Sequence, residues 1–94
     1  MKATPHSYHL RLSKVDKEVL SLGIRNSIKN GKLSPDNPKT MARALEILDV
    51  IEGIFLVVTA WDVDYILIPA LGTVPVGMIE DDMYDCLRKI SNHE

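Results

Sequence analysis

The spacing of apolar residues changes several times along the chain, and each change predicts a different element. From residue 6 to residue 12, apolar and polar positions alternate, with Tyr8, Leu10 and Leu12 on one side. A period of two is typical of a strand with one buried face, so we predict a half-buried strand here.

The next segment has helical spacing and is predicted as a helix over residues 14–30. Ser13 stands where a cap is expected, and Asp16 follows three residues later, as in a capping box. Asn30-Gly31 is a clear stop signal, while Gly23 marks a place where the helix could break. The helix carries two nearly opposite apolar stripes, one of Val15, Val19 and Leu22 and one of Leu20, Ile24 and Ile28. Two stripes indicate a helix that is either sandwiched between two surfaces or broken and redirected.

A second helix is predicted to begin at Pro38, with Asn37 as its cap, because proline tolerates the first helical position. Its apolar residues form one broad arc: Met41, Ala44, Leu45, Ile47, Leu48 and Ile51. Residues 54–61 are rich in β-branched and aromatic side chains, which favours a strand. Asp62-Val63-Asp64 is then predicted as a turn and residues 65–69 as a second strand, forming a hairpin that is apolar on both faces.

The last predicted element is a helix over residues 80–91, with acidic residues at its start and basic residues near its end. Its predicted buried face carries Met83, Cys86, Leu87 and Ile90. The sequence therefore predicts a single α+β domain over residues 1–94, built in two layers in the order β-α-α-β-β-α. The alternative is a mostly α fold in which residues 38–61 form one long helix.

Composition agrees with a globular domain, since 46% of the 94 residues are hydrophobic and 26% are charged. The net charge is −2, but residues 1–43 carry nine Lys and Arg against three Asp and Glu, whereas residues 44–94 carry two against ten. Such a split raises the question of nucleic acid or charged partners, unless the two halves neutralise each other in the fold or in a dimer.

Location is constrained by the single cysteine and by the apolar stretch over residues 53–79. One cysteine allows no internal disulfide, which favours a reducing compartment. The apolar stretch would place Asp62 and Asp64 near the middle of a bilayer, so we interpret it as buried structure. We expect a cytoplasmic protein without a membrane segment.

No motif in the chain names a reaction, a metal or a cofactor, and we expect no cofactor and no enzymatic activity. The loop over residues 72–77 lacks the ending of a phosphate loop, and the acidic residues lack calcium-loop spacing. An enzyme of this sequence would need a pocket that joins His9 or Cys86 to a carboxylate.

The function that the pattern favours is a small protein-binding or regulatory domain, of the accessory, inhibitor or immunity type found in bacteria and phages. Surplus apolar surface usually marks an interface, so a protein partner or a homo-oligomer is expected. The predicted partner-binding residues are Leu20, Ile24, Ile28, Trp61 and Tyr65.

An alternative is DNA binding, because the order strand, helix, helix in the basic half resembles a ribbon-helix-helix domain. The resemblance implies that two strands pair across a dimer, with Ser7, His9 and Arg11 facing the bases. It also implies that the start of the second helix, near Lys39 and Thr40, holds a phosphate. A regulator or antitoxin would use the basic half in this way.

Overall fold

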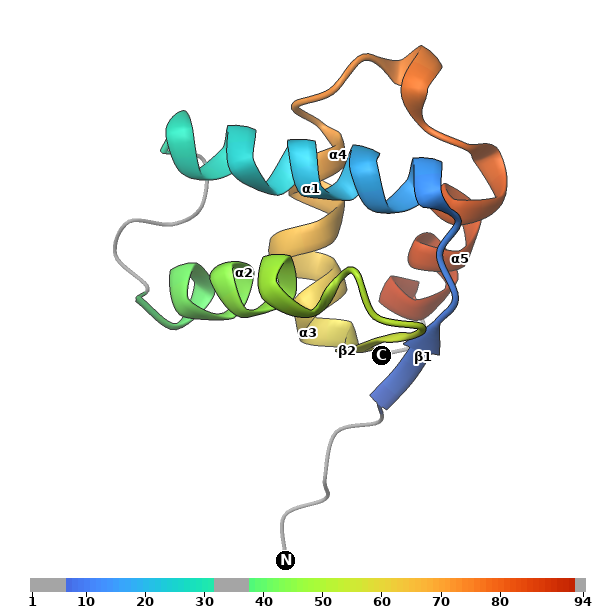
Figure 1. Cartoon of the computed structure of the whole chain (residues 1–94), viewed down its shortest axis with the longest axis horizontal. Helices are drawn as coiled ribbons and strands as arrows, with labels where there is room; N and C mark the ends of the chain where they lie inside the picture. Colours follow the sequence, from blue (N-terminus) through green and yellow to red (C-terminus); the bar gives the residue numbers. More distant parts are fainter. Residues whose placement is uncertain (1–6, 32–37, 93–94) are drawn as a thin grey trace, which may run out of the picture.

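The computed structural model describes residues 7–31 and 38–92, and its fold class is α+β as the sequence predicts. A two-stranded antiparallel sheet lies at one side of a helical body (Figure 1). The elements are β1 (Ser7–Leu10), α1 (Lys14–Lys29), α2 (Pro38–Val50), β2 (Leu56–Thr59), α3 (Ala60–Asp62), the π-helical turn η1 (Val63–Leu67), α4 (Ile68–Leu71), the 3-10 turn η2 (Val76–Met78) and α5 (Asp81–Asn92).

Helix α1 forms largely as its sequence predicts. The Ser13 hydroxyl accepts a hydrogen bond from the Asp16 N–H, the Asp16 carboxylate accepts one from the Ser13 N–H, and the capping box is complete. The chain leaves α1 at Asn30, and Gly31 takes a positive φ of 68° that suits glycine.

Of the two alternatives for this helix, the break at Gly23 does not occur, because α1 runs through Gly23 without interruption. Gly23 is instead a point where α1 lies very close to α4: a Cβ placed there would lie 2.5 Å from the carbonyl oxygen of Ala70. The Thr73 hydroxyl joins the same two segments, since it lies within hydrogen-bonding distance of the carbonyls of both Gly23 and Ala70. Gly23 therefore allows α1 and α4 to pack closely and does not end α1.

The segment after β2 differs from its prediction. The predicted turn over residues 62–64 and the predicted strand over residues 65–69 are wrong, because α3, η1 and α4 form one helical segment over residues 60–71. The long-helix alternative over residues 38–61 is also wrong, since α2 ends at Val50 and β2 follows. A second capping box, between Thr59 and Asp62, starts the 60–71 helix.

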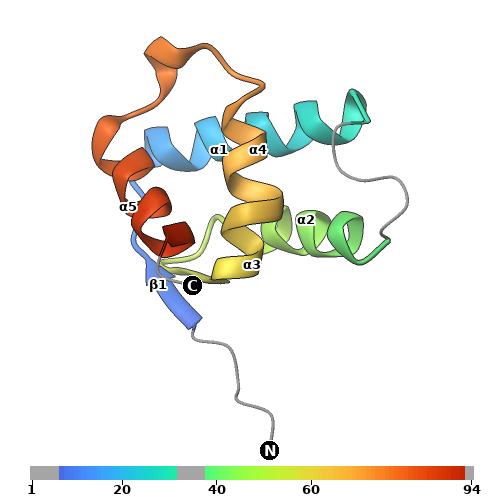
Figure 2. The same cartoon turned by 180° about the vertical axis from the view of Figure 1, so that it is seen from behind.

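The 60–71 helix is the centre of the domain. In both views α1 and α2 lie on the same side of it and cross it at a steep angle, while α5 packs near its first half (Figures 1 and 2). Its fully or nearly fully buried apolar residues are Ala60, Val63, Ile66, Leu67, Ala70 and Leu71. These residues recur every three or four positions, so they form the face that packs into the core, while Trp61 and Tyr65 on another face are exposed.

The sheet covers the lower end of this core. β1 pairs with β2 in the register Ser7 opposite Thr59 and Leu10 opposite Leu56. Leu10, Leu56 and Val58 are buried, whereas Ser7, His9 and Val57 are exposed, so one face of the sheet is in the core and the other is in solvent. The expected cap Asn37 and the first predicted strand residue, His6, lie outside the described residues.

Candidate functional site

An exposed apolar surface lies around the turn η2, where the chain arches away from the body between α4 and α5 (Figure 1). Val76 is 84% exposed and Met78 42%, and on α1 Val15 is 52% exposed. Leu22 lies seven residues after Val15, on the same face of α1, and is also exposed. We call these four residues the η2 surface.

The η2 surface is hollowed on both sides of the turn. One hollow of about 600 Å³ separates the turn from α1, and it is lined by Val15, Glu18, Val19, Leu22, Gly77, Met78, Ile79 and Glu80. The other, of about 500 Å³, separates the turn from α4 and α5, and it is lined by Ile68, Leu71, Gly72, Val76, Ile79, Asp81 and Tyr84. Ile79 lines both hollows, so they lie next to each other.

The predicted partner-binding residues do not form this surface. Leu20 and Ile24 are fully buried in the core, and Ile28 is partly buried against it, so this stripe of α1 faces inward. Trp61 and Tyr65 are exposed, and their ring centroids lie 5.4 Å apart. The stripe of α1 that is available to a partner is the opposite one, with Val15 and Leu22.

The residues proposed for DNA binding are not gathered on one surface. Ser7, His9 and Arg11 are exposed, but Lys39 lies at the start of α2, at the far end of the molecule from β1 (Figure 1). Thr40 is only 3% exposed. Strand β1 is also paired within its own chain, through β2, rather than being free on both edges.

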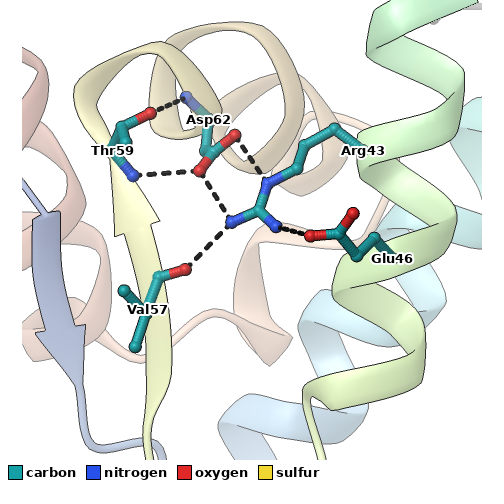
Figure 3. Close-up of polar contacts among 5 residues, drawn as sticks. All are labelled: Arg43, Glu46, Val57, Thr59 and Asp62. Atoms are coloured by element: carbon teal, nitrogen blue, oxygen red, sulfur yellow. Dashed lines mark hydrogen bonds and ion pairs between the residues drawn. The ribbon is translucent and has the colours of Figure 1, made fainter. Parts of the chain in front are cut away.

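Arg43 on α2 makes the most extensive polar cluster among the described residues (Figure 3). Its Nε and Nη2 donate to the two oxygens of Asp62, each at 3.0 Å, and Nη2 also donates to the Val57 carbonyl at 3.0 Å. Nη1 pairs with Glu46 one turn further along α2. Asp62 is only 3% exposed, and it accepts a further bond from the Thr59 N–H at 2.9 Å.

This Arg43 cluster is structural. Hydrogen bonding to the Asp62 carboxylate is the main reason that the pKa of the Arg43 guanidinium is raised, so the guanidinium stays ionised. Both carboxylate oxygens of Asp62 accept hydrogen bonds from the protein, and the side chain is almost fully buried, so it does not face an open site. The cluster ties α2 to β2 and α3, and the pairing of Arg43 with Asp62 joins the basic half to the acidic half.

A groove runs between β1 and α5. One part, of about 390 Å³, is lined by Tyr8, His9, Leu10, Asp82, Asp85, Cys86, Lys89 and Ile90. The adjoining part, of about 190 Å³, is lined by His9, Leu10, Arg11, Leu12, Asp16, Asp82, Met83, Cys86 and Leu87. The parts share four residues, so they form one trough, which we call the β1–α5 groove. The prediction that Cys86 is buried is wrong, because its thiol side chain is exposed in this groove.

The groove brings together His9, Cys86 and Asp82, the three residue types that a thiol enzyme uses. However, no hydrogen bond joins any two of them in the described part of the chain, and the ring partner of His9 is Phe55, at 6.1 Å between centroids. An activated nucleophile needs a base in hydrogen-bonding contact and a third group that orients the base. Within residues 7–31 and 38–92, no cluster of three His, Cys, Asp or Glu side chains could hold a metal ion.

Carboxylates crowd the end of the groove near Leu12. A hydrogen bond with Asp16 is the main cause of a raised pKa at Glu80, and repulsion by Asp16 and Asp82 raises this pKa further. The Ser13 hydroxyl donates a hydrogen bond to Glu80 at 3.3 Å, and this bond lowers the pKa of Glu80. Among the described residues, no ion pair joins Glu80 to a Lys or Arg side chain.

Comparison with known proteins adds no relative. No protein-family model, curated protein or solved structure matches this chain. Among the described residues, none of the helices combines the length and apolar character needed to cross a membrane.

Proposed function

We propose that this chain is a small non-enzymatic regulatory domain that binds a protein partner through the η2 surface. The observation that supports the proposal is the large apolar exposure of Val15, Leu22, Val76 and Met78 around two adjoining hollows. Single exposed apolar residues are ordinary, but four of them rimming one hollowed region are typical of an interface.

The position of η2 also supports an interface. Val76 is 84% exposed on the arch between α4 and α5, whereas the preceding apolar residues Leu71 and Val74 are buried in the core. The Val76 side chain therefore contributes little to the stability of the fold. Its exposure to water is unfavourable, and burial against a partner would remove that unfavourable contact. Fully burying a valine or methionine side chain stabilises a complex by about 1.5–3 kcal/mol.

As part of the same proposal, we place the domain in the cytoplasm. The exposed thiol of Cys86 supports this, because a reducing compartment keeps such a thiol from oxidation and intermolecular pairing.

The test compares wild type with a variant that carries Val76→Glu and Met78→Glu. Each protein is immobilised, and bound proteins are recovered from an extract of the native host, while light scattering measures self-association. The matched control is Leu45→Glu, because Leu45 is 53% exposed on α2 and lies outside the η2 surface. We expect a partner, or a second copy of the chain, that is bound by wild type and the control and lost from the η2 variant.

A result in which all three proteins remain monomeric and recover the same set of proteins would contradict the proposal. Circular dichroism must show the same helix content in all three, so that lost binding reports the surface and not the fold.

A further inference from the structure

The two edges of the sheet differ in how their backbone groups are used. On β2, the Val57 carbonyl accepts a hydrogen bond from Arg43 and the Thr59 N–H donates to Asp62. Both groups therefore point away from β1, toward α2 and α3. The Arg43 cluster covers the outer edge of β2 and protects it from further pairing.

The outer edge of β1 is open. In an antiparallel pair, residues directly opposite each other have N–H and C=O groups that point either toward each other or both away. Ser7 faces Thr59 and His9 faces Val57, so the backbone groups of Ser7 and His9 also point away from their partner strand. In the described part of the chain, no other backbone or side-chain group hydrogen bonds with them. Two unpaired donors and two unpaired acceptors therefore alternate along this edge.

The β1–α5 groove follows the same edge. Its lining runs from Tyr8 to Leu12 along the strand and includes side chains from both faces of the sheet, but it includes no residue of β2. The five residues from Tyr8 to Leu12, of which the first three belong to β1, span at most about 13 Å when extended, which is room for four or five residues of an extended chain. The opposite wall is α5, so an occupant would lie between a strand edge and a helix.

The charges in the groove define the occupant. Asp82 and Asp85 are exposed on the α5 wall, and neither forms an ion pair with any described residue. Asp16 adds a third carboxylate at the Leu12 end, and Glu80 lies close to it outside the lining. The two cations of the lining are Arg11, at the same end, and Lys89, at the other, so carboxylates outnumber cations by three to two. A basic side chain at the Leu12 end would relieve the repulsion among these carboxylates.

We propose that the β1–α5 groove binds an extended segment of another protein, which adds a strand to the outer edge of β1 and places a Lys or Arg side chain against Asp16 and Asp82. The segment would hydrogen bond to the backbone of Ser7 and His9, and alternate side chains would lie in the groove. This site is separate from the η2 surface and does not depend on it.

The experiment begins with a random twelve-residue peptide library displayed on phage, selected against the full chain. One selected peptide is synthesised with a fluorescent label, and its affinity is measured by fluorescence anisotropy. We expect selected peptides to alternate β-forming residues with at least one Lys or Arg. Changing Asp82→Asn should weaken binding by about threefold to tenfold, because a charge-assisted contact is lost.

The decisive variant is His9→Pro. Proline removes the N–H that points to the groove but leaves the hydrogen bonds between β1 and β2 intact, a position where an edge strand tolerates proline. We expect the affinity for the peptide to fall about tenfold, because one hydrogen bond is lost and the proline ring keeps the peptide backbone further from β1. The matched control His9→Val keeps the N–H and should bind within about twofold of wild type.

A second measurement leaves the protein unchanged. The selected peptide is N-methylated at alternate amides in two versions, and only the version whose methyl groups face β1 should lose binding. Equal binding by both versions would overturn the proposal, and so would full binding to His9→Pro or a failure to select any peptide.

Two further outcomes would identify a different occupant of the groove or a different binding site for the peptides. A wild type that dimerises at high concentration, with a monomeric His9→Pro variant, would show that the occupant is a second copy and would overturn the proposal. Peptides that lose binding to the variant with Val76→Glu and Met78→Glu, but bind His9→Pro normally, would support the proposed function and overturn this inference.

Discussion

The contact between Gly23 and Ala70 gives the sharpest prediction about stability. In a solvent-exposed helix, Gly→Ala would stabilise by about 1 kcal/mol, because alanine has the higher helix propensity. At this position the new Cβ would lie 2.5 Å from the Ala70 carbonyl oxygen and 2.9 Å from its carbon, well inside normal contact. Neither atom belongs to a flexible side chain, so one of the two helices must move.

We expect Gly23→Ala to destabilise the domain by about 2 kcal/mol. Overpacking of a core costs about 1–3 kcal/mol and occasionally more, and a clash with backbone belongs at the upper end. Moving the helices apart would also stretch the contacts that Thr73 makes at 3.2 Å to Gly23 and 2.7 Å to Ala70. Urea unfolding followed by circular dichroism measures the change, and thermal unfolding should show a midpoint about 8–16 °C lower.

The control is Gly77→Ala, where the added Cβ meets no atom within 4 Å. We expect that variant to stay within about 0.5 kcal/mol of wild type. If Gly23→Ala is as stable as wild type or more stable, the two helices do not approach as described, and the account of Gly23 is refuted.

Three other predictions concern buried or crowded polar groups, each checked by urea unfolding. Asp62→Ala should destabilise by about 3 kcal/mol, since it leaves the partly buried Arg43 without its carboxylate and removes a cap; a loss below about 1 kcal/mol would refute the assigned role. Ser27→Ala should stabilise by about 1 kcal/mol, because the buried Ser27 hydroxyl has no hydrogen-bond partner among the described residues, and a loss of stability would contradict this. Glu80→Gln should stabilise the domain more at pH 7 than at pH 4. The pKa of Glu80 is raised in the fold, so protonated Glu80 stabilises the wild type in acid, and this stabilisation is lost as the pH rises through the folded pKa. A difference between variant and wild type that does not change with pH would exclude that contribution.

Local signals in the sequence predicted much of the fold. Ser13 and Asp16 marked the start of α1, Asn30-Gly31 marked its end, and Pro38 marked the start of α2. Each of these signals depends on backbone geometry within a few residues, and no distant part of the chain can easily override it.

The central helix was missed because its composition favours a strand. Val63, Tyr65 and Ile66 have high β propensity, but propensity is a weak preference that tertiary packing overrides. An all-round apolar segment suits a buried helix as well as a buried strand, and periodicity alone does not distinguish them. The pair Thr59 and Asp62, with the spacing of a capping box, was the signal that could have identified the helix start.

The candidate sites were harder to predict, because both depend on residues far apart in the chain. Choosing between the two stripes of α1 requires knowing that the 60–71 helix packs against Leu20 and Ile24, which leaves Val15 and Leu22 outside. The β1–α5 groove likewise joins residues 8–12 to residues 82–90, and no local pattern relates the two segments.

The pairing of β1 with β2 also has a kinetic consequence. Leu10 meets Leu56 only after the chain has closed a long loop, whereas α1, α2 and α5 form from local contacts. The edge of β1 and the wall of α5 come from opposite ends of the chain, so the groove exists only when both ends are in place. A ligand of the groove would therefore bind the native state and not the partly folded one, and it would stabilise the complete fold by an amount that grows with the ratio of its free concentration to its Kd.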